Sequence, residues 1–258
     1  MPLRLSALTL CAAVAQSAAA KPLLGLQDCP KNASNVPPYT LPPTACARPN
    51  MDRSDICAHN QRPPPLTNEL VAGARVYANR HEALESQVPR GGRIVEVGTM
   101  NGHLSRWLAS HLHPTELVIM DISPDAIRKC ETFHSKGIQS GKVRCVLGDS
   151  VRGLKALPDN HFDMIYVDAD HAYGAVCADM EAAKPKLKPG GLMVMNDYYS
   201  FESQFLANPF AGAKEPRFGV YGIIHATNEF MLRYGWKMAY LAMHPMNFPD
   251  VAIVKPHV

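Results

Sequence analysis

The chain has 258 residues, of which 47% are apolar and 19% are charged, a composition typical of a soluble protein with one sizeable core. This composition excludes a fibrous protein, a wholly disordered protein and a polytopic membrane protein. The 26 basic and 23 acidic residues leave a net charge of +3. So small a surplus does not predict binding to nucleic acid or to an anionic membrane.

Residues 1–20 predict a secretory signal peptide. They carry one basic residue, Arg4, followed by a small and apolar run that ends in three alanines, a site of the A-x-A type that signal peptidase accepts. Polar residues interrupt the run, which argues against a membrane anchor, although an organelle-targeting presequence is an alternative. A glycosylation sequon begins at Asn32. We therefore expect a protein of the secretory pathway or the extracellular space, without a stable membrane anchor after cleavage.

Residues 21–66 form a proline-rich arm that holds ten of the 22 prolines. Prolines at this density predict a segment without regular structure. Cys29, Cys46 and Cys57 also lie in the arm. Two of them could pair in an oxidising compartment, but the sequence does not select the pair.

Residues 67–258 are predicted to form one α/β domain. A first helix is expected after Thr67, because Leu70, Ala74 and Tyr77 follow at helical spacing. Short apolar runs then alternate with helix-compatible stretches. These runs begin at Arg93, Glu116, Lys142, Phe162 and Gly191. Continuous apolar strands separated by helices are typical of a parallel sheet that is covered on both faces, as in a doubly wound fold.

The C-terminal part predicts one more helix and a hairpin. Residues 220–234 follow the spacing of one helical face, and Gly235 ends that helix. Two apolar runs, which begin at Lys237 and Asp250, are joined by the short segment HPMNFP. Strands joined by so short a connection must be antiparallel neighbours.

Polar residues at the ends of the first two strands indicate a nucleoside-bearing cofactor. Glu96, Gly98 and Gly102 form a turn in which glycines allow backbone amides to approach a ligand. Asp121 follows 23 residues after Gly98, the distance expected for a carboxylate that binds ribose hydroxyls. At the end of the third strand, Asp149 and Ser150 could contact an adenine amino group or cap the next helix.

The motif E-x-G-x-x-x-G, met by Glu96, Gly98 and Gly102, resembles that of the class I methyltransferases that use S-adenosylmethionine. The resemblance covers residues 67–258. It implies a Rossmann-like sheet of seven strands, mostly parallel, with an antiparallel strand in the C-terminal hairpin. It also places the glycine turn beside the methionine part of the cofactor, Asp121 at the ribose, and Asp149 with Ser150 at the adenine. Glu96 would organise the cofactor loop.

The ends of the fourth and fifth strands predict a metal site. Asp168, Asn196 and Asp197 would converge there as oxygen ligands of the kind that Mg²⁺ or Ca²⁺ prefers. Carboxylates at such close quarters require a cation or a shared proton. The arrangement resembles the metal-dependent O-methyltransferases and related proteins with D-x-D-H-x-Y. This chain departs from the catechol-type pattern because Asn precedes Asp and no lysine follows Asp168 closely.

Asp170 and His171 are the candidate proton acceptors, although either could instead cap the following helix. We therefore expect an S-adenosylmethionine-dependent methyltransferase that acts on an oxygen of a small molecule with the help of Mg²⁺ or another divalent cation. A metal-independent methyltransferase and a non-catalytic binding domain are the alternatives. Cys130, Cys145 and Cys177 are expected to be core thiols.

Overall fold

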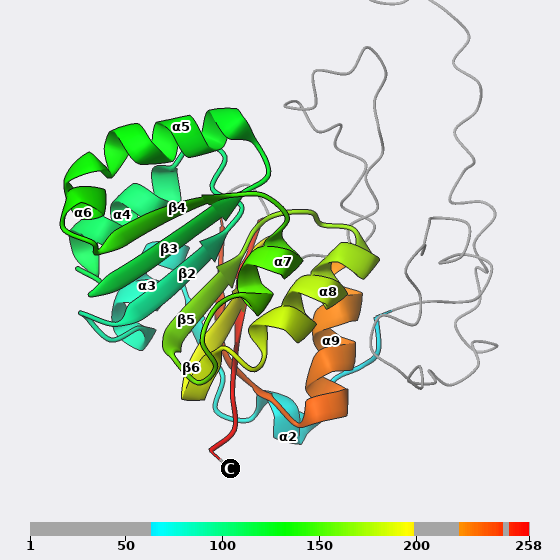
Figure 1. Cartoon of the computed structure of the whole chain (residues 1–258). Helices are drawn as coiled ribbons and strands as arrows, with labels where there is room; N and C mark the ends of the chain where they lie inside the picture. Colours follow the sequence, from blue (N-terminus) through cyan, green and yellow to red (C-terminus); the bar gives the residue numbers. More distant parts are fainter. Residues whose placement is uncertain (1–62, 199–221, 245–247, 258) are drawn as a thin grey trace, which may run out of the picture. The chain divides into compact units, whose positions relative to one another are not determined.

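The computed structural model describes residues 63–198, 222–244 and 248–257. The predicted signal peptide and all but the last few residues of the proline-rich arm lie outside this range. The described residues contain one sheet of eight strands, in the order β1-β7-β8-β6-β5-β2-β3-β4, with helices on both faces (Figure 1). The doubly wound α/β fold is therefore confirmed, with one strand more than the seven expected.

Five adjacent parallel strands, in the order β6-β5-β2-β3-β4, reach one edge of the sheet and overlap the five predicted apolar runs, although β6 begins four residues before the run predicted from Gly191. Most of their residues are buried, because helices cover both faces of the sheet. The strands are β2 (Arg93–Val97), β3 (Glu116–Asp121), β4 (Val143–Leu147), β5 (Phe162–Val167) and β6 (Leu187–Met195).

The C-terminal hairpin is also confirmed. β7 (Lys237–Ala242) and β8 (Asp250–Val254) are antiparallel neighbours, and β8 inserts between β7 and β6. The preceding helix, α9 (Ile223–Tyr234), ends where Gly235 adopts the left-handed conformation with φ of 67°. Glycine adopts this conformation without a steric penalty, which explains the stop.

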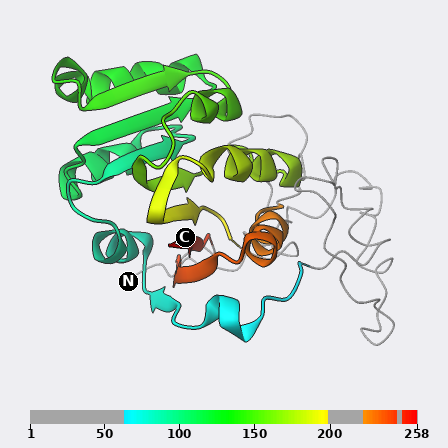
Figure 2. The same ribbon diagram turned by 60° about the horizontal axis from the view of Figure 1, so that its bottom comes forward.

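The first predicted helix is wrong as a continuous element. The structure divides it into α2 (Asn68–Val71), β1 (Arg75–Tyr77) and α3 (Arg80–Gln87). Gly73 turns the chain with φ of 83°, and the side chain of Asn79 caps α3. β1 pairs in parallel with β7 and is the eighth strand. Figure 2 shows this cyan segment beside the orange and red C-terminal strands.

The helices form two layers (Figure 1). One layer contains α3, α4 (His103–His111), α5 (Pro124–Phe133) and α6 (Ser135–Gln139). The other contains α7 (Ser150–Lys155), α8 (Tyr173–Ala183) and α9. Each layer packs on its own face of the sheet through a separate cluster of buried apolar residues. None of the helices in the described ranges has the length and apolar character needed to cross a membrane.

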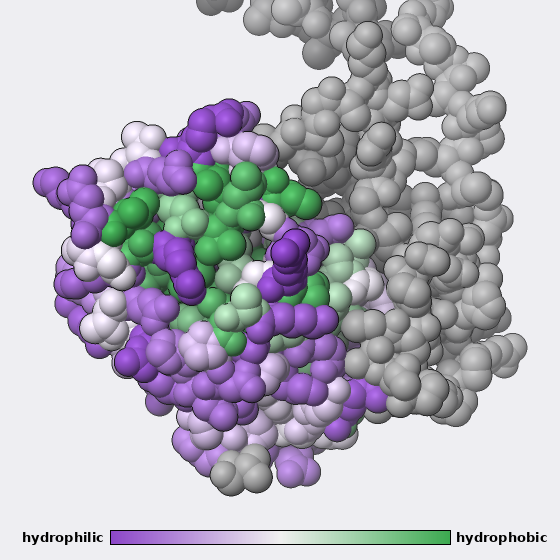
Figure 3. Space-filling view, viewed as in Figure 1, coloured by the Kyte–Doolittle hydropathy of each residue, from purple (hydrophilic) through white to green (hydrophobic). Residues whose placement is uncertain are grey.

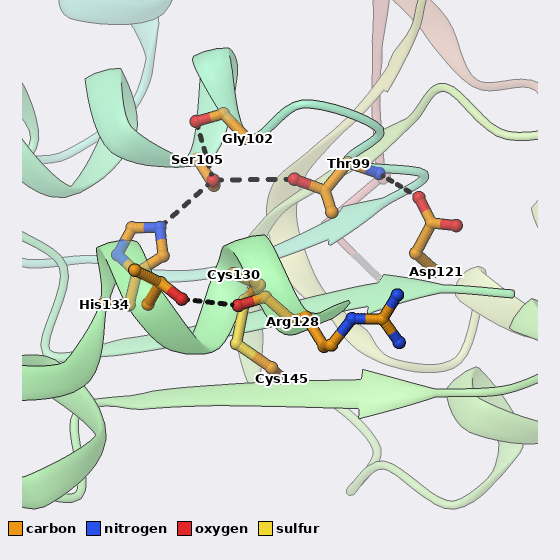
Figure 4. The surroundings of a disulfide bond; sticks show 9 residues. Thr99, Gly102, Ser105, Asp121, Arg128, Cys130, His134 and Cys145 are labelled. Atoms are coloured by element: carbon orange, nitrogen blue, oxygen red, sulfur yellow. Dashed lines mark hydrogen bonds between the residues drawn. A yellow bond between two sulfur atoms is a disulfide. The ribbon is translucent and has the colours of Figure 1, made fainter. Parts of the chain in front are cut away.

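Two cysteines of the domain form a disulfide, so the expectation of core thiols is wrong for them. Cys130 of α5 bonds to Cys145 of β4 (Figure 4). α5 packs on β4 and brings the two Cα atoms to 6.2 Å, within the range that a disulfide requires. Cys177, on α8, is a buried thiol as expected.

Candidate active site

A cavity of about 840 Å³ lies at the carboxyl ends of β2, β3, β4 and β5, where a doubly wound sheet binds its ligands. This volume suits a small-molecule site. Eight residues singled out in the sequence line it: Glu96, Gly98, Asp121, Asp149, Ser150, Asp168, Asp170 and His171. Arg80 and Asp179 also line it, although the sequence analysis did not select them. Gly102, Asn196 and Asp197 are not among its lining residues.

The glycine turn after β2 is shaped by contact with the neighbouring strand end. Gly98 has φ of 83°, and a Cβ atom there would overlap the carbonyl group of Asp168 and the Cα atom of Ala169. Glycine is therefore required here because the two strand ends pack closely against each other. The sequence analysis had instead attributed the glycine to the approach of a ligand. Gly102, with φ of 69°, is the N-cap of α4.

Asp121 fastens the glycine turn to β3. Its Oδ2 atom accepts hydrogen bonds from the backbone amides of Thr99 at 2.9 Å and Met100 at 3.0 Å, and its Oδ1 atom accepts one from Ser123 at 2.8 Å. An ionised carboxylate has about four acceptor positions. Asp121 can therefore hold the loop and still accept a hydrogen bond from a ligand hydroxyl.

The cavity has an apolar border beside Asp121. Met100 and Ile122 both line it, and they are 56% and 77% exposed. Leu147, which ends β4, is 53% exposed. Figure 3 shows hydrophobic residues gathered on the face where Figure 1 places β4 and α7. An exposed apolar surface at the edge of a cavity favours a ligand with a flat, apolar part.

Glu96 is a buried carboxyl group in the wall of the cavity. It is 1% exposed, and within the described part of the chain its Oε2 atom has no hydrogen-bond partner. Burial raises its pKa to about 8, and the charges of Asp168 and Asp121 act in the same direction. A positively charged ligand group would offset this accumulation of negative charge.

Asp149 and Ser150 meet Asp179 at the start of α7. The Oδ1 atom of Asp149 accepts a hydrogen bond from the backbone amide of Arg152 at 2.8 Å, so Asp149 caps α7. The hydroxyl of Ser150 donates to Oδ1 of Asp179 at 2.6 Å. Burial raises the pKa of Asp179 to about 6, and the Ser150 hydrogen bond opposes this shift.

Asp168, His171 and Asp197 converge from two adjacent strand ends. The Nε2 atom of His171 lies 3.5 Å from Oδ1 of Asp168 and 3.3 Å from Oδ2 of Asp197. Burial opposes protonation of the imidazole, but the two carboxylates outweigh it and raise the pKa of His171 to about 9. Asp197 has φ of 58°, a left-handed conformation that is uncommon outside glycine and concentrates at functional sites.

Asn196 belongs to a separate buried network. Its Nδ2 atom donates to Oδ1 of Asp250 at 3.0 Å and contacts the hydroxyl of Tyr166 at 3.4 Å. Arg80 donates to Asp250 at 3.1 Å, and the hydroxyl of Tyr166 donates to it at 2.8 Å. The sequence analysis selected Asn196 of this network, as a metal ligand, and gave no role to Arg80, Tyr166 or Asp250.

The predicted metal ligands are thus only partly brought together. Asp168 and Asp197 approach each other, but His171 contacts both, and Asn196 directs its amide nitrogen to Asp250. In the described ranges, no group of three or more His, Cys, Asp or Glu side chains is arranged to hold a metal ion. The Oδ1 atom of Asp170 accepts a hydrogen bond from the backbone amide of Ala172 at 2.9 Å, which forms an Asx turn ahead of α8; the N-cap of α8 is Ala172, so the alternative of a capping role for Asp170 is wrong.

Comparisons with known sequences agree with this geometry. Residues 95–198 match a family described as a methyltransferase domain. A protein of Mycolicibacterium paratuberculosis, named as an O-methyltransferase, is 29% identical over 173 residues, which cover 57% of this chain and 77% of that protein.

Solved structures share the fold. A possible exported protein of Bordetella parapertussis superposes with a TM-score of 0.53 at 17% identity, covering 69% of this chain and 66% of that one. The O-methyltransferase TomG of Streptomyces achromogenes, solved with S-adenosylmethionine, has a TM-score of 0.50 at 21% identity and covers 68% and 77%. These likenesses concern the fold alone.

Proposed function

The chain is an S-adenosylmethionine-dependent O-methyltransferase-like protein, and on this premise we propose that it methylates an oxygen of a small molecule bound beside His171. One observation carries the proposal. His171 and Asp168, one of the two carboxylates that hold it, line the same cavity as the glycine turn and Asp121. A cofactor site and a candidate acceptor site therefore lie next to each other.

The cofactor would lie against the glycine turn, Glu96, Asp121 and the start of α7. S-Adenosylmethionine supplies an electrophilic methyl group on a sulfonium centre. The carboxyl-rich wall suits its positive charge, and the apolar border formed by Met100 and Ile122 suits a flat base. Asp121 would accept hydrogen bonds from the ribose hydroxyls while it holds the loop.

His171 is the proposed proton acceptor for the acceptor hydroxyl. Methyl transfer requires a deprotonated oxygen held in line with the methyl group, so positioning and proton removal are the tasks left to the protein. The carboxylates of Asp168 and Asp197 orient the imidazole and stabilise its protonated form. Because its raised pKa of about 9 keeps His171 protonated at neutral pH, it accepts the proton only in its neutral form, so methylation should rise as the pH approaches 9.

Assistance by Mg²⁺ or another divalent cation at Asp168, Asn196 and Asp197 is the more specific form of the proposal. The described arrangement does not fit it, because His171 contacts both carboxylates and the Asn196 amide donates to Asp250. Arg80 and His171 supply positive charge that the carboxylates need in any case.

The test measures transfer of a labelled methyl group from S-adenosylmethionine to a panel of phenols, catechols and hydroxy acids. We expect methylation of some panel members in excess EDTA and its loss in His171→Gln. His161→Gln, at the opposite end of β5, is the matched control. Activity that returns only with Mg²⁺ would favour the metal-assisted form. Cofactor binding without methylation of any compound would favour a non-catalytic binding domain.

We also propose that the protein resides outside the reducing cytosol. The Cys130–Cys145 disulfide supports this location, since disulfides persist mainly in oxidising compartments. The predicted cleavage after residue 20 lies outside the described residues. Expression in a eukaryotic secretory host should yield a chain that begins near Lys21 and loses mass on deglycosylation at Asn32. A mature chain that retains Met1 would contradict cleavage.

A further inference from the structure

We propose that Asp179 recognises the exocyclic amino group of adenine in the bound cofactor, and that Ser150 positions Asp179 for this task. The inference rests on the proposed function, because it concerns the base of S-adenosylmethionine. The proposal assigns recognition of the adenine to Asp179 of α8, and not to Asp149 and Ser150 after β4. α7 and α8 lie side by side on one face of the sheet (Figure 1).

Ser150 is already committed to Asp179. A serine hydroxyl has one proton, and Ser150 donates it to Oδ1 of Asp179 at 2.6 Å. Ser150 therefore cannot also donate a hydrogen bond to a ligand without releasing the carboxylate. Its geometry identifies it as a positioning residue.

Asp149 is committed to the helix that it begins. Its Oδ1 atom accepts from the Arg152 amide at 2.8 Å, a hydrogen bond that stabilises the N-terminus of α7. Asp149 is also exposed, so a hydrogen bond from a ligand would only replace one from water and would discriminate less than a bond to the buried Asp179. Asp149 is thus the weaker candidate for reading the base, although it also lines the cavity.

Asp179 is a buried carboxylate in the wall of the cavity, and one of its two oxygens is available to a ligand. It is 2% exposed, and it lines the cavity together with Ala175 and Ala178, which share its face of α8. The two alanines leave room for a flat ring beside the carboxylate. Within the described part of the chain, Oδ1 of Asp179 accepts from Ser150, and no hydrogen bond involves Oδ2.

The chemistry of the two groups is complementary. An ionised carboxylate only accepts hydrogen bonds, and the adenine amino group only donates them. Hypoxanthine presents a carbonyl oxygen at the same position, which a buried carboxylate would repel. A site built around a specific hydrogen bond rejects a ligand that lacks the partner group. The ligand class is therefore a 6-aminopurine nucleoside.

The test is calorimetric binding of S-adenosylhomocysteine and of its deaminated analogue, S-inosylhomocysteine, to the intact protein. We expect the wild type to bind the adenosyl compound at least about tenfold more tightly. In Asp179→Asn, the amide can both donate and accept, so the preference should shrink to roughly threefold or less. Asp179→Ser, which is smaller and uncharged, should show the same loss of preference if Asp179→Asn does not fold.

Two further variants separate recognition from support. Ser150→Ala should weaken binding of the adenosyl compound but retain the preference, and Asp149→Asn should retain it in full. Equal binding of both compounds by the wild type would overturn the proposal. Loss of the preference in Asp149→Asn with its retention in Asp179→Asn would also overturn it. A folded wild type that binds neither compound would instead refute the proposed function.

Discussion

Gly98 and Asp168 touch through their backbones, at the point where the ends of β2 and β5 meet. The two strands are parallel neighbours, and the amide of Asp168 donates a hydrogen bond to the carbonyl of Val97 at 2.8 Å. No space remains for a side chain on Gly98. This contact joins the proposed cofactor loop to the carboxylate that orients His171, so the two halves of the candidate site share one rigid support.

Gly98→Ala should therefore lower the free energy of unfolding as well as obstruct the proposed cofactor site. A left-handed conformation costs a residue with a Cβ atom about 1–2 kcal/mol, and overpacking against the Asp168 backbone adds about 1–3 kcal/mol. Gly73→Ala is the matched control, because Gly73 has the same φ of 83° but no atom within 4 Å of a Cβ position. Urea unfolding should show the larger loss for Gly98→Ala, and equal losses would contradict the packing argument.

Asp121→Ala should weaken binding of S-adenosylhomocysteine by about 1–3 kcal/mol, the cost of leaving polar partners unmade. Two effects contribute: the ribose hydroxyls lose an acceptor, and the amides of Thr99 and Met100 lose the carboxylate that holds the loop. Asp121→Asn keeps one acceptor oxygen and should lose less. Calorimetry measures both, with Asp125→Ala, an exposed residue of α5, as the control. Unchanged affinity in a folded Asp121→Ala would remove Asp121 from the site.

The sequence predicted the five parallel strands because buried parallel strands have a simple sequence pattern, a short run of Val, Ile, Leu and Met between helix-compatible stretches. β1 has no such pattern. It has three residues, and Tyr77 continues the helical spacing begun by Leu70. Only the turn at Gly73 and the cap at Asn79 separate this edge strand from the helices on either side.

The candidate site was predictable where a residue ends or closely follows a parallel strand, since parallel strands bring their carboxyl ends to one edge. Asp121, Asp168 and Asp197 follow this rule. Arg80 and Asp179 lie on helices, and the direction of their side chains depends on how those helices pack. The Cys130–Cys145 disulfide could not be predicted for the same reason, because it depends on where α5 crosses β4.

Removing the Cys130–Cys145 disulfide should destabilise the domain by about 3 kcal/mol, the value expected for a loop of its 15-residue separation. The bond lies next to a buried hydrogen bond, 3.1 Å long, between His134 and Ser105, and the Ser105 hydroxyl donates to the carbonyl of Gly102 (Figure 4). If α5 loosens, these hydrogen bonds should weaken and the glycine turn should become less well held.

Thermal unfolding with and without dithiothreitol measures the contribution of the disulfide. The wild type should lose stability on reduction, and S-adenosylhomocysteine should bind more weakly to the reduced protein. The double variant Cys130→Ser with Cys145→Ser should be equally unstable in both conditions. A wild type that is indifferent to dithiothreitol at full reduction would exclude a stabilising disulfide.

The pKa of Glu96 predicts how stability depends on pH. Its carboxyl group titrates near 4.5 when the chain is unfolded and at about 8 in the folded protein, because burial disfavours its charge. Between these values the folded state holds a proton that the unfolded state has released. The stabilisation is complete below pH 4.5 and is lost as the pH rises to about 8. The slope is about 1.4 kcal/mol per pH unit.

Glu96→Gln tests this directly, since glutamine imitates the protonated carboxyl group in shape and cannot titrate. Urea unfolding from pH 5 to pH 8 should show a steeper decline for the wild type than for Glu96→Gln. Glu131→Gln, an exposed position on α5, is the control and should follow the wild type. Parallel profiles for wild type and Glu96→Gln would mean that Glu96 is ionised in the folded protein throughout this range. A basic or cationic partner would then have to accompany it in the wall of the cavity.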